Sequence, residues 1–349
     1  MAELVKFLDL LDYNIPMITA SEEHRVIRQI MDRYQVGPRF AHEYLCHWYK
    51  PEDFASLDLD NLDLSPLHTS WFDFALSTNL RGIEFYDQLA PYLPETSRRY
   101  LDVGCGYGGF LVAFAKNGYQ VAGLDINPWL VNYSAVNISD FDVDGEVLLA
   151  DILAGGLNEK LGRFDVISCY DVIEHVDNVP LCLERLVDYL NPGGVLGLKI
   201  PNKDSIRFVS SDGHFNLFGI TLLEHDLAFQ YQQSLFTDEY SVGEYYPLPF
   251  YVRSLESLGC TVHVINRDQY LRFRQAPKLI SDLLSQYRAF RREMRPKLPA
   301  QVTAALNGAF RKYLLELAAA FLIPRNVPAF RERYLVDTWT VLAVKNPQP

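Results

Sequence analysis

The chain has 349 residues, and 49% of them are hydrophobic, which is enough to bury a sizeable core and excludes a disordered chain. Its formal charge of −12 disfavours a nucleic-acid partner, because bulk electrostatics would repel a phosphate backbone. The five cysteines are scattered without a CxxC pair, so they fit neither a zinc site nor a disulfide framework, and we expect a reduced, cytoplasmic setting.

The first part of the chain, residues 1–95, reads as helical and irregular segments separated by prolines. Residues 1–16 predict an amphipathic helix rather than a signal peptide, because charged residues interrupt the apolar positions. From about residue 98, short β-rich runs alternate with helical stretches, a pattern typical of a parallel sheet. The sequence predicts strands at 99–103, 119–124, 146–150, 164–170, 194–200, 260–265 and 337–344.

Helices are predicted at about 108–117 and 178–190, the second ending at "NPGG" (191–194). The stretch from about 270 to 330 is also helical and separates the last two strands. We therefore expect a helical cap over 1–95 and an α/β domain over 96–349 with a helical insertion at about 270–330. Such additions would shape a substrate pocket, since ligands of open α/β sheets bind beyond the carboxyl ends of the strands. The longest apolar run, 317–323, is too short to cross a membrane.

A glycine cluster, "YLDVGCGYGG" (100–109), follows the first predicted strand. Glycine at this density indicates a tight turn or a close approach of backbone to a ligand. A P-loop is excluded, because no lysine follows the glycines. Gly104, Gly106 and Gly109 match the dinucleotide fingerprint loosely, and Asp125 fits a ribose-binding acid about 20 residues further on. These features serve an NAD site and a related nucleoside site equally well.

Two further acids favour a nucleoside that carries positive charge. Asp102 precedes the first glycine of the loop, where it would repel a pyrophosphate and attract a cationic, zwitterionic ligand. Asp151 follows the third predicted strand, where it can accept a hydrogen bond from an adenine amino group.

The segments "LDVGCGYGGFLVAFAKNGYQVAGLDINP", "ADIL" and "FDVISCYDVIEHVDN…LNPGGVLGLKIPN" resemble the successive motifs of class I S-adenosylmethionine-dependent methyltransferases. The resemblance is close over about 98–204 and looser beyond. It implies a Rossmann-like sheet of seven strands with helices on both faces and an antiparallel last strand, plus the helical additions at either end of the chain.

Carried over residue by residue, the resemblance implies a cofactor site for S-adenosylmethionine. Gly104, Gly106 and Tyr107 would form the cofactor loop, which Asp102 would orient. Asp125 would bind the ribose hydroxyls beside Ile126, and Asp151 with the backbone of Ile152 would read the adenine. Tyr170 and Asp171 would flank the cofactor after the fourth strand.

The segment "DVIEHV" (171–176) is similar to one in ubiquinone-biosynthesis-type O-methyltransferases and their small-molecule relatives. If it is helical, Asp171, Glu174 and His175 share one face at i, i+3 and i+4. Three interpretations stay open: a structural role, a general base at His175, or a divalent metal held by these three residues with His214. We do not favour the metal, and we give His214 a modest preference over His175 as the base.

These features together predict a methyltransferase that acts on a small molecule, with a hydroxyl oxygen as the accepting atom. Methylation of carbon or nitrogen is the alternative, and a NAD(P)-dependent oxidoreductase is a more distant one. We expect no nucleic-acid partner and no membrane span, and the helical additions are compatible with a homodimer.

Overall fold

The fold was established from a computed structural model, which describes residues 25–154, 156–157, 161–236, 242–323 and 326–347. The helix expected over residues 1–16 lies outside these residues. Among the residues described, no helix combines the length and apolar character that a membrane crossing requires.

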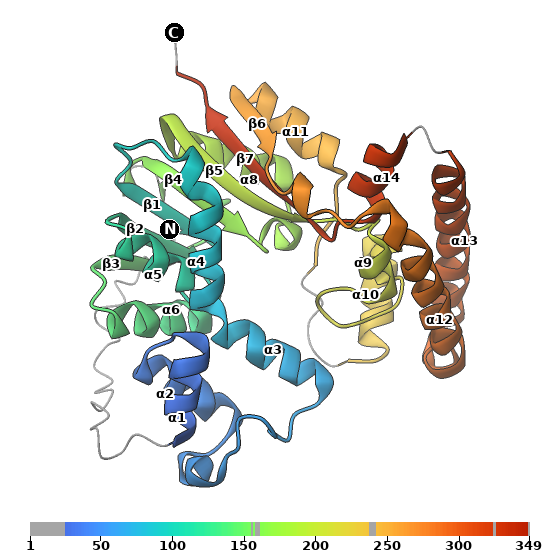
Figure 1. Cartoon of the computed structure of the whole chain (residues 1–349), viewed down its shortest axis with the longest axis horizontal. Coiled ribbons are helices and arrows are strands. Elements are labelled where there is room, and N and C mark those ends of the chain that lie inside the picture. The colour runs from blue at the N-terminus through green and yellow to red at the C-terminus, as the bar shows by residue number, and fades with distance from the viewer. Residues whose placement is uncertain (1–24, 155, 158–160, 237–241, 324–325, 348–349) are drawn as a thin grey trace. The chain divides into compact units, whose positions relative to one another are not determined.

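Seven strands form one sheet, as expected, and their order in the sheet is β3-β2-β1-β4-β5-β7-β6 (Figure 1). The strands are β1 (Arg99–Val103), β2 (Gln120–Asp125), β3 (Gly145–Leu149), β4 (Phe164–Tyr170), β5 (Leu190–Pro201), β6 (Cys260–Val264) and β7 (Thr338–Lys345). β1 pairs in parallel with both β2 and β4, and β2 pairs in parallel with β3. β7 runs antiparallel to β5, which confirms the expected reversal of the last strand.

The start of β5 differs from the prediction. The "NPGG" segment does not stop a helix but already belongs to this strand, which begins at Leu190, because the preceding helix ends earlier, at Asp188. The Asn191 side chain donates a hydrogen bond to Asp165 of β4 at 2.8 Å, and Gly193 takes a positive φ of 78°. Asn191 and Gly193, which are residue types typical of turns, therefore lie within the strand β5.

Helices flank the sheet, and others precede β1 and separate β6 from β7 along the chain. They are α1 (Arg25–Tyr34), α2 (Pro38–Trp48), α3 (Pro66–Leu76), α4 (Thr78–Leu89), α5 (Gly109–Lys116), α6 (Pro128–Asp140), α8 (Val179–Asp188), α9 (Ile206–Ser210), α10 (His225–Gln233), α11 (Leu248–Ser257), α12 (Ala276–Glu293), α13 (Ala300–Leu322) and α14 (Val327–Tyr334). Short 3₁₀ turns also occur, among them η4 (Ile173–His175) and η6 (Arg267–Gln269). The helical character expected for about 270–330 is confirmed by α12, α13 and α14.

The chain packs as two compact units. Unit 1 comprises residues 1–170, 181–197 and 344–349, and unit 2 comprises 171–180 and 198–343. The strands β1 to β4 belong to unit 1, whereas β5 and β7 contribute residues to both units. A domain boundary near residue 95 stays a prediction.

In unit 1, the helices before the sheet bury their apolar faces against α6 and the glycine loop. Their shared core includes Phe40 and Tyr44 of α2 and Tyr133 and Val136 of α6, with Tyr107 packed beside them. α4 and α5 approach even more closely, because Gly82 of one faces Gly109 of the other.

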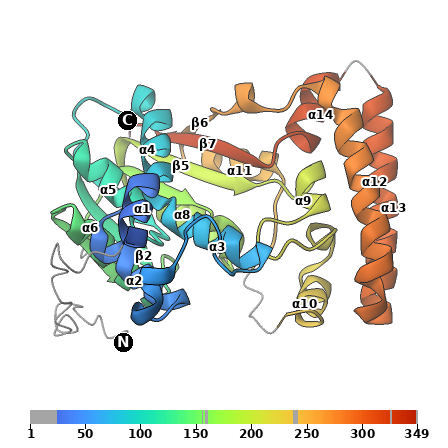
Figure 2. The ribbon, with the colours of Figure 1, turned by 60° about the horizontal axis from the view of Figure 1, so that its bottom comes forward.

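Unit 2 has its own hydrophobic core, to which α9, α10, α12, α13 and α14 all contribute. α12 and α13 are long helices that lie side by side in both views (Figures 1 and 2). The rings of Phe218, Phe290 and Phe310 meet in this core, with centroids 5.3 Å apart for the first pair and 5.1 Å apart for Phe218 and Phe310.

Candidate functional site

The glycine loop leaves β1 in a backbone conformation that side chains rarely adopt. Gly104, Gly106 and Gly108 have φ values of 72°, 51° and 77°. This left-handed backbone conformation costs glycine little energy, whereas a residue with a Cβ would be strained in it. Among the described residues, a Cβ at Gly106 would find only one atom within 4 Å, the Gly104 carbonyl oxygen at 3.9 Å. The space beside Gly106 is therefore open within unit 1, as a backbone that receives a ligand requires.

The last two glycines of the cluster have a different cause, which is close packing. A Cβ at Gly108 would lie 2.6 Å from Ser134 Oγ, and one at Gly109 would lie 2.2 Å from the backbone oxygen of Thr78. Gly109 N also donates a hydrogen bond to Thr78 Oγ1 at 3.2 Å. The glycine cluster thus has two causes: a turn whose backbone is open to a ligand, and a close contact between helices.

Asp125 ends β2 beside this loop. One carboxylate oxygen accepts a hydrogen bond from Gly106 N at 3.0 Å, and the other accepts one from Asn127 N at 2.9 Å. The residue is buried, and burial raises the pKa of its carboxyl, although these backbone hydrogen bonds partly oppose the shift. Each oxygen keeps a second lone pair, so the carboxylate can still accept from two hydroxyl groups.

Asp102 lies deeper than the sequence analysis expects. It is 3% exposed, and its Oδ1 accepts a hydrogen bond of 2.5 Å from Ser168 Oγ, which also contacts the Tyr100 hydroxyl. Burial raises the pKa of Asp102 to about 8; the Ser168 hydrogen bond opposes this, and the nearby Asp125 carboxylate adds to it. The carboxyl therefore belongs to a buried chain of hydroxyl groups rather than to an open loop face.

The remaining residues proposed for the cofactor also lie at strand ends of unit 1. Ile126 follows β2 and is 69% exposed. Asp151 follows β3, is exposed, and accepts a hydrogen bond from Leu153 N at 2.8 Å, while Ile152 beside it is buried.

Tyr107 and Tyr170 are held by aromatic rings that the sequence analysis does not identify as part of the site. Tyr107 meets Phe40 and Tyr44 edge-on, with ring centroids 6.2 Å and 5.7 Å away. Tyr170 packs on Phe85 at 4.1 Å. In the sequence, these partner rings are marked only by the amphipathic spacing of the helices that carry them. That spacing predicts that the rings are buried but not which residue each ring packs against.

The segment is not helical at Asp171, so the condition for Asp171 to share a helical face with Glu174 and His175 is not met. Only residues 173–175 form a 3₁₀ turn, η4, and Asp171 stands before it with a positive φ of 54°. Its carboxylate pairs instead with Lys199 of β5, Nζ to Oδ2 at 3.0 Å. The left-handed backbone of Asp171 turns its side chain away from the direction that a helix would impose.

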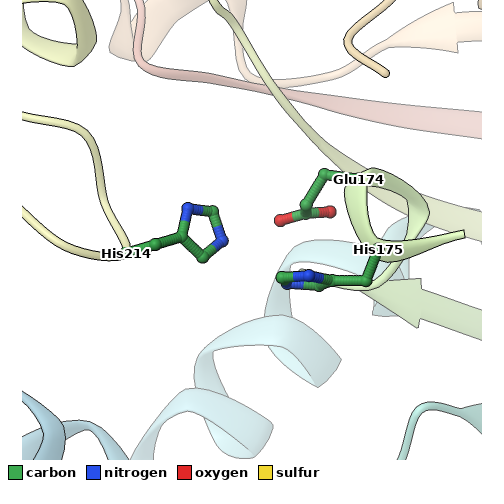
Figure 3. Close-up of side chains that lie close together, drawn as sticks. All are labelled: Glu174, His175 and His214. Carbon is green, nitrogen blue, oxygen red and sulfur yellow. The ribbon is translucent and has the colours of Figure 1, made fainter. Parts of the chain in front are cut away.

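Three side chains of unit 2 nevertheless come together: Glu174, His175 and His214 (Figure 3). Each offers one ligand-type atom, and these atoms lie within 4.8 Å of one another. The two imidazole rings meet edge-on, with centroids 5.0 Å apart. The loop that carries His214 follows α9, so tertiary packing brings this residue to the turn that follows β4. Asp171 is not a member of the group.

The electrostatics of this cluster are those of a buried acid and base. Burial raises the pKa of Glu174 to about 7, and the Asp171 carboxylate adds to the effect, whereas His214 and Lys199 oppose it. Burial alone would lower the pKa of His214, but Asp212, Glu174 and Asp171 outweigh it, so the pKa rises. Glu174 Oε2 is buried without a hydrogen bond partner in the described part of the chain. Such a group is costly unless it has a function or an unseen partner.

Comparison with known proteins identifies the family to which the chain belongs. The model described as "Methyltransferase domain" matches residues 78–263, just over half of the chain. Among curated proteins, the ubiquinone biosynthesis O-methyltransferase of Xanthomonas campestris pv. campestris (strain B100) is 33% identical over 124 residues, 35% of this chain and 51% of that protein. The same enzyme of Xanthomonas euvesicatoria pv. vesicatoria (strain 85-10) is 34% identical over 112 residues, 32% of this chain and 46% of that one.

The chain thus spans about half the length of the curated relatives it matches. A solved structure titled as a SAM dependent methyltransferase from Archaeoglobus fulgidus is similar with a TM-score of 0.45 and 14% identity, covering 80% of this chain and 99% of the other. The family match rests on the segment that holds the glycine loop, the acids at the strand ends and the Glu174 turn. The chain belongs to the methyltransferase domain family.

Proposed function

We propose that this protein transfers a methyl group from S-adenosylmethionine to a hydroxyl group of a small molecule. The observation that carries the proposal is the contact between Asp125 and the glycine loop. The Asp125 carboxylate ends a central parallel strand and is bound to the backbone of Gly106. Ligands of such sheets bind beyond the carboxyl ends of the strands, and an acid at this point accepts the hydroxyls of a ribose.

The residues of unit 1 fit this cofactor. The open space at Gly106 admits it to the backbone, and the spare lone pairs of Asp125 suit two neighbouring hydroxyls. The exposed Ile126 offers an apolar surface of the kind a nucleobase covers, and Asp151 is exposed to accept from an amino group. When bound, the cofactor would supply a methyl group on a positively charged sulfonium. Burial raises the pKa of Asp102 to about 8, and a positive charge bound nearby would oppose that rise and favour the ionised carboxylate.

The accepting atom is proposed from the cluster in unit 2. A hydroxyl must lose its proton as the new bond forms, so a base has to accept it. His214 and His175 are the candidate bases, and Glu174 is a buried carboxyl beside them. The family gives no support to the oxidoreductase alternative. A small-molecule substrate also accords with the acidic chain, which has little to attract nucleic acid.

The same cluster supports a second version of the chemistry, in which Glu174, His175 and His214 hold a divalent metal that binds the substrate hydroxyl. Two imidazoles and a carboxylate form a donor set that transition metals accept, and the unpartnered Glu174 Oε2 fits a ligand role. Asp171 would not join it, because its carboxylate is paired with Lys199.

Two measurements test the proposal. Titration calorimetry should show binding of S-adenosylmethionine, and transfer of a labelled methyl group should be sought across phenols, aliphatic alcohols, amines and activated carbon acids. Preferential binding of NADH would overturn the family-based proposal. Transfer only to amines or carbon acids would overturn the choice of oxygen.

A further inference from the structure

His214 has different surroundings on the two sides of its ring. Figure 3 shows the ring nitrogen farther from the point of attachment, Nε2, turned toward Glu174 and His175. The other nitrogen, Nδ1, is buried and makes no hydrogen bond within the described residues. The carboxylate on the Nδ1 side of the ring is that of Asp212, whose Oδ2 lies 3.6 Å from Nδ1. The imidazole therefore stands between a carboxylate and the cluster.

Asp212 is itself held firmly. It is 2% exposed, and its Oδ2 accepts hydrogen bonds from the backbone of His214 at 2.9 Å and Phe215 at 3.1 Å. Its Oδ1 accepts one from Leu217 N at 2.6 Å. Three backbone donors fix where the carboxylate points. The carboxylate beside Nδ1 is consequently a fixed feature of the loop.

A fixed carboxylate beside one ring nitrogen selects the tautomer of a neutral imidazole. A proton on Nδ1 faces the negative charge, whereas a lone pair there would be repelled by it. The proton then stays on Nδ1, and Nε2 keeps its lone pair. Carboxylates play this part toward histidines that act as bases or as metal ligands.

We propose that Asp212 is a positioning residue, which keeps the His214 proton on Nδ1 and directs the Nε2 lone pair toward Glu174 and His175. The inference rests on the proposed function in one respect only, namely that Nε2 would accept the substrate proton or bind a metal. The tautomer itself is a property of the protein and does not depend on the reaction.

A purely structural role is the competing explanation, because the same carboxylate braces the loop. The first experiment separates the two without any activity measurement. Protein labelled with ¹⁵N-histidine is examined by long-range ¹H–¹⁵N NMR at a pH where His214 is neutral, with His214→Ala used to assign the signal. The wild type should show the Nδ1–H tautomer, and Asp212→Asn should shift it toward Nε2–H. A wild-type signal of the Nε2–H form would overturn the proposal, whether or not the variant folds.

The second experiment is a double-mutant cycle in the methyl-transfer assay. Asp212→Asn should lower kcat by about 10–100-fold while leaving the KM for S-adenosylmethionine unchanged. In the His214→Ala background the same substitution should have an effect of less than about twofold, because its partner is gone. An equal loss of kcat in both backgrounds would show that Asp212 acts through the loop alone.

Ser211→Ala is the matched control for the loop. It removes the hydrogen bond from Ser211 Oγ to Asn216 Oδ1 at 3.0 Å, which involves neither Asp212 nor His214 although Ser211 is next to Asp212 in the chain. It should leave both the tautomer and kcat unchanged. If no methyl transfer is found with any acceptor, the proposed function fails, while the NMR result still decides the role of Asp212.

Discussion

Ser168 of β4 donates a hydrogen bond to the buried carboxyl of Asp102 on the neighbouring strand β1, Oγ to Oδ1 at 2.5 Å. The two residues are direct partners in the parallel register of these strands. The pairing places an acid inside the sheet, at the root of the glycine loop. Because this acid is buried, the free energy of unfolding of unit 1 depends on whether Asp102 is protonated.

Asp102 should make the protein less stable as the pH rises. Burial raises the pKa of Asp102 to about 8, above its unfolded value, so the folded chain keeps a proton that the unfolded chain has lost. This contribution to stability is complete below the unfolded pKa and is lost as the pH rises through about 8. The free energy of unfolding should fall by up to about 1.4 kcal/mol per pH unit across that window.

Urea unfolding of Asp102→Asn across the same pH range should remove this fall. Asp165→Asn is the control with the opposite sign, because hydrogen bonds from Arg98 N and Asn191, acting against burial, lower the pKa of that carboxyl. Its contribution is present at neutral pH and is lost as the pH falls through its folded pKa. An unchanged pH dependence in Asp102→Asn would mean that Asp102 ionises normally.

Asp125→Ala should weaken the binding of S-adenosylmethionine. The substitution removes a pair of charge-assisted hydrogen bonds to the ribose, which we expect to cost about 2–4 kcal/mol of affinity. Titration calorimetry measures it, with Asp144→Ala as the control, an exposed acid just before β3. Because Asp125 also binds Gly106 N, the stability of the variant has to be measured alongside. Wild-type affinity in a folded Asp125→Ala variant would contradict the assignment.

Alanine at two helical glycines should change stability in opposite directions. At Gly109 the new Cβ would lie 2.2 Å from the Thr78 backbone oxygen, so α4 and α5 must separate, at a cost of about 1–3 kcal/mol. At Gly308 in α13 the new Cβ would meet no described residue within 4 Å beyond the helix's own backbone, so alanine should stabilise by about 0.5–1 kcal/mol through helix propensity. Thermal unfolding of both variants tests this. Equal effects would show that the α4–α5 contact gives way easily.

His214→Ala should lower turnover by about 10²-fold or more while leaving the affinity for S-adenosylmethionine nearly intact. The substitution removes the proposed proton acceptor but no residue of the glycine loop. His225→Ala is the matched control, because its side chain is 53% exposed at the start of α10. Steady-state kinetics of His175→Ala, His214→Ala and the control should rank the two half-buried histidines. Full turnover in both would leave the reaction without a histidine base.

Metal dependence distinguishes the two versions of the chemistry. If Glu174, His175 and His214 hold a metal, a chelator should abolish turnover and Mg²⁺ or Mn²⁺ should restore it, and Glu174→Gln should weaken that rescue. If histidine acts as the base, activity should be the same before and after chelation. In the metal version, Asp171→Asn should weaken metal affinity less than Glu174→Gln does, because Asp171 is paired with Lys199 and acts on the cluster only through its charge.

The core of the fold could be predicted closely from the sequence. The bounds of β1 and β4 agree with the predicted 99–103 and 164–170, because strands buried in a parallel sheet read as short, nearly continuous apolar runs. Prediction failed at "NPGG" and at Asp171. Turn residues and helical spacing are local patterns, and both segments take their conformation from partners elsewhere in the chain: Asp165 for Asn191 and Lys199 for Asp171.

The sequence by itself determined where the acids and glycines stand relative to the strand ends, because that order is a local property of the chain. Only the tertiary structure decided which side chains gather and how they ionise. His214 joins Glu174 and His175 across about forty residues, and Asp212 stands behind it, through packing that no local pattern encodes. Asp102 and Glu174 have raised pKa values because folding removes water from them, and the loss of hydration is a property of the folded environment rather than of the residue.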